Sequence, residues 1–167
     1  MYLFPTVRYH PDPIATGNIV PSAEICRCCG QARGYIYNFR PRKFCPWCIA
    51  DGSAAAKFET MFVDYRPLAE AGLSSDIVEE VSRRTPGYIS IQGEQWRSCC
   101  ADACEFLGDT SREELLAASI DDLCAQWRMK PQDVRAFVVN YYPSADPGVF
   151  KFRCRHCGKA QYHLDFS

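Results

Sequence analysis

The chain has 167 residues, of which 47% are hydrophobic and 23% charged, and its formal net charge is -1 at pH 7. This composition excludes a chain that is mainly disordered, collagen-like or coiled coil, and the charge gives no overall attraction to nucleic acid or to anionic membranes. The exception is cysteine, with 11 residues, and any account of the protein has to explain them.

The first residues do not resemble a secretion signal, because prolines at positions 5, 11 and 13 interrupt them and no apolar stretch follows a basic one. No segment approaches the roughly 18 apolar residues that span a bilayer. We therefore expect a cytoplasmic protein without membrane insertion. In that reducing compartment, paired cysteines bind metal or carry out redox chemistry more often than they form crosslinks.

The first half of the chain alternates between irregular and regular patterns. Residues 1–22 are rich in proline and aromatic residues and predict an extended, irregular segment. Alternating aromatic residues predict a strand at 35–39. The segment 49–63 is expected to contain an Ala-rich helix that Asp51 or Ser53 could cap. A second helix is expected from Ser74 or Ser75 to about Arg84, followed by a strand at 88–96 with Ile89 and Ile91 on one face.

In the second half, Ser111 and Glu114 have the spacing of a capping box, which predicts a helix, or a helix pair broken near Ser119, over residues 111–127. Pro131 suits the first turn of another helix. Strands are expected at 149–153 and 162–166, with His163 exposed. The pattern is α+β, with short strands and several amphipathic helices. We expect a single compact domain over 1–167, with an N-terminal half (1–66) and a C-terminal half (67–167) that each carry one zinc site.

The strongest motif consists of two cysteine pairs. Cys26-x-x-Cys29 and Cys45-x-x-Cys48 are separated by 15 residues, a spacing typical of a four-thiolate zinc site. Each pair offers two thiolates from one compact turn, so the two pairs complete a tetrahedral shell. A hairpin carrying the first pair and a helix N-terminus carrying the second would form a treble clef.

A second zinc site is predicted from an internal repeat. The segments CRCCGQA at 26–32 and CRHCGKA at 154–160 agree at five of seven positions. The pair Cys154 and Cys157 is therefore expected to bind metal together with Cys100 and Cys104, which are expected to lie just before a helix, as Cys45 and Cys48 do. Cys99 is the alternative to Cys100, and His156 is a reserve ligand.

Three cysteines, Cys28, Cys99 and Cys124, are left over and are expected to be small buried hydrophobic residues. An alternative interpretation of Cys45-Pro-Trp-Cys48 is a thioredoxin-like dithiol. The context disfavours it, because Cys26 and Cys29 can complete a zinc shell and no βαβ frame surrounds the motif.

Several motifs resemble the CbrC-like family of small bacterial proteins. They are YHPDPxxTG at 9–17, CCGxARGYIY at 28–37, CPWCIADGSAA at 45–55, RTPGY at 84–88, WxxCCxDACxFLG at 96–108 and FxCxHCGK at 152–159. The family's name implies an association with tolerance to a colicin. Its members often carry His at the position of Cys99, which favours Cys100 as the ligand.

Closed four-thiolate sites have no open position for water or substrate, so both zinc ions are expected to be structural. The favoured hypothesis is that the chain is a binding protein with a protein partner. The resemblance would add that this binding protects the cell against a toxin. No catalytic residues are assigned. An enzyme that uses His10 with Asp12, or Glu94, stays open as an alternative.

Nucleic-acid binding is the other alternative. Basic residues surround both predicted sites, namely Arg27, Arg33, Arg40, Arg42 and Lys43 at the first and Lys151, Arg153, Arg155 and Lys159 at the second. Tyr35, Tyr37 and Trp47 could stack on bases. Electrostatic compensation explains the same residues, because four thiolates and one divalent zinc ion leave each site with a charge of about -2.

Overall fold

The computed structural model describes residues 3–39, 43–143 and 145–166. Over these residues the chain forms short antiparallel strands and seven helices, so the predicted α+β class is confirmed. In chain order the elements are β1 (Ile19–Pro21), β2 (Tyr35–Tyr37), α1 (Pro46–Ala50), α2 (Ser53–Phe58), α3 (Arg66–Glu70), α4 (Ser75–Arg84), β3 (Ser98–Cys99), β4 (Asp102–Ala103), β5 (Glu105–Asp109), α5 (Arg112–Ala117), α6 (Ile120–Trp127), α7 (Pro131–Asn140), β6 (Gly148–Arg153) and β7 (Ala160–Asp165).

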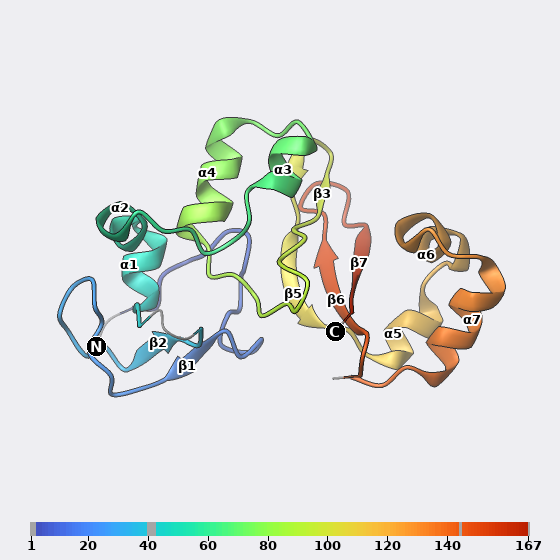
Figure 1. Ribbon diagram of the computed structural model, residues 1–167, viewed down its shortest axis with the longest axis horizontal. Coiled ribbons are helices and arrows are strands. Elements are labelled where there is room, and N and C mark those ends of the chain that lie inside the picture. The colour runs from blue at the N-terminus through green and yellow to red at the C-terminus, as the bar shows by residue number, and fades with distance from the viewer. Residues whose placement is uncertain (1–2, 40–42, 144, 167) are drawn as a thin grey trace.

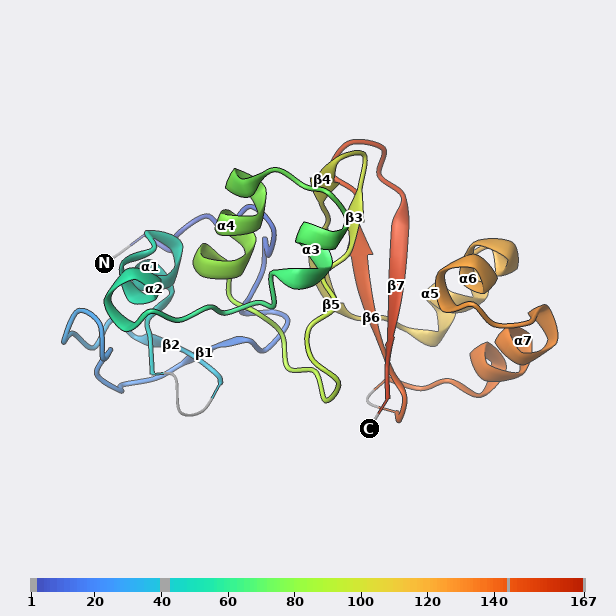
Figure 2. The ribbon, with the colours of Figure 1, turned by 45° about the horizontal axis from the view of Figure 1, so that its top comes forward.

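A three-stranded antiparallel sheet, in the order β5-β6-β7, occupies the middle of the molecule. Helices α5, α6 and α7 lie on one side of it, and α3, α4 and the N-terminal elements lie on the other (Figure 1). Two small antiparallel pairs, β1 with β2 and β3 with β4, stand apart from this sheet. The β3–β4 hairpin lies beside the connection between β6 and β7, as the turned view in Figure 2 shows.

The buried apolar side chains form three cores. The N-terminal core includes Ile19, Phe44, Ile49 and Phe62. The central core is aromatic and includes Tyr9, Tyr88, Trp96, Phe106 and Phe152, with the Tyr88 and Phe106 rings stacked 4.5 Å apart. The C-terminal core includes Leu115, Leu123, Val134, Val138 and Leu164. The central sheet thus contributes side chains to two cores. The central core covers one of its faces and the C-terminal core covers the other.

Burial on both faces of the sheet changes the expectation for His163. Its neighbours Tyr162 and Leu164 pack in the C-terminal core, and His163 points to the opposite face. The prediction that His163 is exposed is wrong, because only 8% of it is accessible. Burial is the main cause that lowers its pKa to about 4.

The Ala-rich helix expected within 49–63 forms as α2, but it is shorter than that segment, and a separate helix, α1, precedes it. The segment divides into α1 and α2 at Gly52, which has a φ of +80° and caps the second helix. Glycine adopts this left-handed conformation at little cost, so it allows the chain to turn between two short helices.

The predicted strand at 88–96 is not formed. Ile89 and Ile91 are 54% and 70% exposed, and side-chain hydrogen bonds hold the segment in place of a strand ladder. Asp165 on β7 accepts hydrogen bonds from the backbone N–H groups of Ile91 (3.0 Å) and Gln92 (3.2 Å) and from the Ser90 hydroxyl (2.8 Å). This segment is therefore fixed against the end of β7.

Most of the other helix predictions are confirmed. The helix α4 begins after Ser74 and ends at Arg84, α5 and α6 separate at Ser119, and Pro131 occupies the first turn of α7. Strands β6 and β7 lie where they were expected, within two residues. Strands β1 and β5 were not predicted, because residues 1–22 and 99–110 carry no clear alternation.

Candidate metal centres

The first cysteine cluster contains the four residues that the sequence predicted. The sulfur atoms of Cys26, Cys29, Cys45 and Cys48 all lie within 4.8 Å of one another, and the Cys29 and Cys45 sulfurs are 3.9 Å apart. A tetrahedral zinc ion with metal–sulfur bonds of about 2.3 Å needs sulfurs about 3.8 Å apart. A disulfide would need about 2.05 Å. The spacing therefore fits a shared metal ion and does not fit a disulfide.

A backbone turn and a helix start position these ligands. The N–H of Cys26 donates to the Gln31 carbonyl (3.0 Å), and the N–H of Gly30, at a φ of +71°, donates to the Cys26 carbonyl (2.8 Å). Cys45 directly precedes α1, and its N–H donates to the Cys26 sulfur (3.2 Å). The first pair thus forms a compact knuckle that faces the start of a helix.

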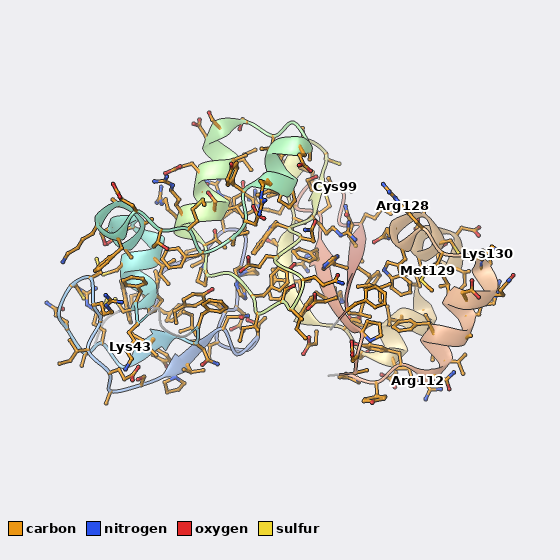
Figure 3. The ribbon with its side chains drawn as sticks, in the orientation of Figure 1. Lys43, Cys99, Arg112, Arg128, Met129 and Lys130 are labelled. Atoms are coloured by element: carbon orange, nitrogen blue, oxygen red, sulfur yellow. The ribbon has the colours of Figure 1, made fainter. Side chains whose placement is uncertain are left out.

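The second cluster has the same spacing. The sulfurs of Cys99, Cys100, Cys154 and Cys157 lie within 4.8 Å of one another. The Cys99 sulfur is 3.7 Å from that of Cys100 and 3.8 Å from that of Cys157. Figure 3 shows Cys99 at the hairpin end of the central sheet, away from the N-terminal elements that hold the first cluster.

The repeat between the two knuckles extends to their hydrogen bonds. The N–H of Cys154 donates to the Lys159 carbonyl (2.9 Å), and the N–H of Gly158, at a φ of +73°, donates to the Cys154 carbonyl (3.0 Å). These bonds correspond one to one with those of Cys26 and Gly30. The internal sequence match therefore reports a real repetition of local structure.

The structure differs from the predicted second ligand set in one member, because Cys99 and not Cys104 joins the cluster. Cys104 is fully buried in the central core, where its carbonyl accepts a hydrogen bond from the Trp96 indole (2.9 Å). The sequence predicts Cys100 and Cys104 just before a helix, by analogy with Cys45 and Cys48. Here residues 98–103 form a hairpin, so Cys100 lies at the turn and Cys104 points inward.

The remaining thiols lie outside both clusters. Cys28 is half-buried and donates a hydrogen bond to the Ser53 hydroxyl (3.4 Å). Cys124 is partly buried against the C-terminal core. His156, the reserve ligand, lies with Nε2 2.9 Å from a carboxylate oxygen of Asp102.

Hydrogen bonds from backbone N–H groups lower the pKa of the first cysteine in each knuckle. Burial opposes the charged form of Cys26, but the N–H groups of Cys29 and Cys45 outweigh it and lower the pKa to about 7. Hydrogen bonding from the N–H of Cys157 lowers the pKa of Cys154 to about 6. In contrast, burial raises the pKa of Cys45 to about 11. Metal binding has to displace the remaining protons, so it depends on pH.

The structure does not bring His10 and Asp12 together as an acid–base pair. His10 is fully buried, with Nδ1 2.7 Å from the Pro86 carbonyl and Nε2 2.7 Å from the Thr16 hydroxyl. The carbonyl can only accept, so Nδ1 carries the proton and Nε2 accepts from Thr16. Asp12 accepts a hydrogen bond from the Ala15 N–H (2.9 Å) in a local turn.

Glu94 lines a shallow pocket of about 420 Å³ together with Phe39, Asp64 and Arg66. Neither His10 nor Asp12 borders it. The residues considered for catalysis thus lie in different surroundings.

The basic residues near the second cluster pair with acidic side chains. Lys151 contacts Glu114, and the nitrogen–oxygen distances are 2.8 Å for Arg153 with Glu105, 2.8 Å for Arg155 with Asp102 and 2.6 Å for Lys159 with Asp122. Each of these four cations thus has an acidic neighbour in the same chain that offsets its charge.

Near the first cluster, Lys43 pairs with Glu24 (2.6 Å). Arg27 and Arg33 lie over the rings of Phe58 and Trp47, at 5.4 and 5.7 Å. Arg40 and Arg42 lie outside the described residues. Cation–aromatic contacts keep the two described arginines close to the surface of the cluster.

Within residues 3–39, 43–143 and 145–166, no helix is both long and apolar enough to cross a membrane.

Comparison with known proteins shows which family the chain resembles. Residues 4–166 match the model of an uncharacterised protein family, UPF0167. A Pseudomonas aeruginosa protein of that family name is 47% identical, over 98% of this chain and 97% of its own. A Mycobacterium bovis protein of that family name is 35% identical, over 98% of this chain and 94% of its own. No solved structure matches.

These findings correct the resemblance drawn from the motifs. The assignment to a CbrC-like family is wrong, because the matching family model and the relatives carry the UPF0167 name, and no link to colicin tolerance accompanies them. The chain belongs to the UPF0167 family.

Proposed function

We propose that this protein is a zinc-stabilised binding protein whose two metal ions bind no substrate and take no part in catalysis. The observation that carries the proposal is that each cluster offers four sulfurs at tetrahedral spacing. Four protein ligands fill the shell of a zinc ion, which leaves no position for water or substrate. Cys26, Cys29, Cys45 and Cys48 would hold one ion, and Cys99, Cys100, Cys154 and Cys157 the other.

A protein partner is supported by the segment that Asp165 fixes. Ile89 and Ile91 are exposed on it, and Phe166, next to Asp165, is 46% exposed. Exposed apolar side chains on a segment with low conformational freedom lose little entropy on association, which favours a binding surface. The hydrogen bonds from Ile91 and Gln92 to Asp165 supply that restraint.

Metal content tests the first part of the proposal. We expect two zinc ions per chain in protein purified without added metal, measured by elemental analysis. Cys45→Ser is expected to lose one ion and to be strongly destabilised, because three of the first cluster's sulfurs belong to the N-terminal core. The matched control Cys124→Ala should keep both ions and cost little stability. Normal metal content and melting temperature in Cys45→Ser would disprove a structural role.

The binding surface is tested with a partner isolated from cells that produce the protein naturally. A partner that then binds the purified chain should bind Ile91→Asp at least about tenfold more weakly. Val139→Asp, which changes a 51% exposed residue on α7, serves as the control. Equal losses in both variants would argue against this surface.

Nucleic-acid binding is the second candidate, favoured by Arg27 and Arg33 at the first cluster and by Lys57, which lines a pocket of about 650 Å³ there with Cys28 and Arg33. If it is correct, a fluorescent single-stranded oligonucleotide will bind, with an affinity that falls steeply with salt. Arg33→Ala would weaken it, and Arg112→Ala on the distant helix α5 (Figure 3) would not.

A further inference from the structure

The two cysteine clusters differ in how far solvent reaches them. In the first, Cys26, Cys45 and Cys48 are buried and Cys29 is partly exposed. In the second, Cys100 and Cys157 are exposed, Cys99 is partly exposed and only Cys154 is buried. Oxidation of a thiol depends on its access to the oxidant. The second cluster is therefore the one that an oxidant in solution can reach.

The backbone that carries the second cluster is also less well supported. Cys100 and Ala101 form the turn between β3 and β4, with φ values of +54° and +57°. Residues with a Cβ atom are strained in this region. The Cys45 ligand of the first cluster instead precedes a helix and lies in the N-terminal core. Three sulfurs of the first cluster belong to the N-terminal core, whereas of the second cluster only Cys154 is buried in the central core, so loss of metal would disturb the core less at the second cluster.

A buried carboxylate holds the two halves of the second cluster together independently of any metal. Asp102, 6% exposed, accepts hydrogen bonds from Arg155 (2.8 Å) in the knuckle and from the hydroxyl of Tyr9 (2.8 Å). His156, also in the knuckle, lies 2.9 Å from it. Because Asp102 belongs to the hairpin, these contacts keep Cys99 opposite Cys157 when the sulfurs lose their metal.

We propose that the second cluster is a reversible redox-responsive metal site, whereas the first is permanent. This inference rests on the proposed function, since it assumes that both clusters hold zinc. The oxidant is a peroxide, and the exposed Cys157 is the sulfur that it oxidises first. The geometry points to Cys99, whose sulfur is 3.8 Å from that of Cys157, as the second partner.

The reaction balances in two steps. The Cys157 thiolate attacks hydrogen peroxide, which breaks the O–O bond, gives a sulfenic acid and releases hydroxide. The Cys99 thiolate then attacks the Cys157 sulfur, forms the disulfide and displaces a second hydroxide. Two thiolates lose two electrons in total, peroxide gains them, and two protons from solvent convert the hydroxides to water. The disulfide would remove two of the four sulfurs that could hold the zinc ion, so the ion would be released.

The test uses the full, zinc-loaded chain. Hydrogen peroxide is added in small excess, released zinc is followed with a chromogenic indicator, and the disulfide is mapped by alkylation and mass spectrometry. We expect one zinc ion per chain to leave at least about tenfold faster than the other, with a Cys99–Cys157 crosslink. A dithiol reductant followed by zinc should restore the second ion. Release of both ions together, or first oxidation within the first cluster, would overturn the inference.

Asp102→Asn tests the role of the carboxylate. After reduction, we expect the second cluster of this variant to bind zinc with an affinity at least about tenfold lower. Groups that orient metal ligands through hydrogen bonds usually have an effect of this size. Asp122→Asn, which removes the partner of Lys159 beside the same knuckle, is the matched control and should behave as the unmodified chain. Equal recovery in both variants would contradict the role of Asp102. A chain that holds no zinc before oxidation would instead refute the proposed function.

Discussion

Individual residues have roles in this protein that depend on backbone atoms far along the chain. Gly87 is one of them: a Cβ atom at this position would lie 2.0 Å from the carbonyl oxygen of Phe62. The neighbouring Pro86 carbonyl contacts His10. Close packing of backbone against backbone leaves no flexible side chain that could move aside. The glycine is thus required where three segments of the chain meet.

Gly87→Ala is expected to lower the free energy of unfolding by about 3 kcal/mol or more, because the new methyl group forces the backbone apart. Urea unfolding followed by circular dichroism measures the change. Gly148→Ala is the control, since its nearest atom beyond its neighbours is 3.8 Å away. It should change stability by less than about 1 kcal/mol. Similar values for the two variants would contradict the close contact between Gly87 and Phe62 as the cause.

At the scale of elements, the helices differ in how their first turns are held. Ser111 at the start of α5 accepts a hydrogen bond from the Glu114 N–H (3.1 Å), and the Glu114 carboxylate accepts one from the Ser111 N–H (3.2 Å). Glu114 also contacts Lys151 on β6. The helix α4 starts at Ser74 without any side-chain cap. The capping box therefore both starts α5 and connects it to the central sheet.

This difference predicts unequal effects of the same substitution. Ser111→Ala should cost about 1 kcal/mol, the usual contribution of a helix cap. Ser74→Ala should cost little, because its hydroxyl makes no capping bond to lose. Thermal unfolding of the two variants under identical conditions compares them directly. A larger loss in Ser74→Ala would contradict the capping described here.

On the scale of the whole molecule, the segment around residues 9–18 joins the N-terminal elements to the central sheet. The Tyr9 carbonyl accepts a hydrogen bond from the Phe106 N–H on β5 (2.8 Å). Asn18 accepts, at its carbonyl, a hydrogen bond from Asn38 next to β2 (2.8 Å). His10 lies between these contacts, and burial lowers its pKa to about 4. The connection therefore depends on a neutral histidine.

Protonation of His10 favours the unfolded chain. Its pKa is about 6.5 when unfolded and about 4 when folded, so between these values the unfolded state binds more protons and stability falls as the pH falls. The loss from this residue approaches about 3 kcal/mol towards pH 4. We expect His10→Gln to have a shallower dependence of unfolding free energy on pH between 6.5 and 4. Acid release of zinc affects both proteins alike, so an unchanged slope would contradict the assignment.

The sequence by itself determined the local features of the fold and of the candidate site. Spacing alone predicted all four cysteines of the first cluster, because two C-x-x-C turns at this separation are a local pattern. The internal match of 26–32 with 154–160 predicted the second knuckle for the same reason. Capping residues and prolines predicted α4, α5, α6 and α7, since helix ends are encoded by neighbouring residues.

Only the tertiary structure decided which residues far apart in the sequence come into contact. Cys99, and not Cys104, faces the second knuckle, because residues 98–103 form a two-stranded hairpin after which Cys104 is buried in the central core. The segment at 88–96 is held by Asp165, about 70 residues further along the chain, so its own alternation could not predict its structure. His163 is buried since the central core and the C-terminal core cover opposite faces of the central sheet. Local propensity is a weak guide wherever distant side chains supply the hydrogen bonds and the burial.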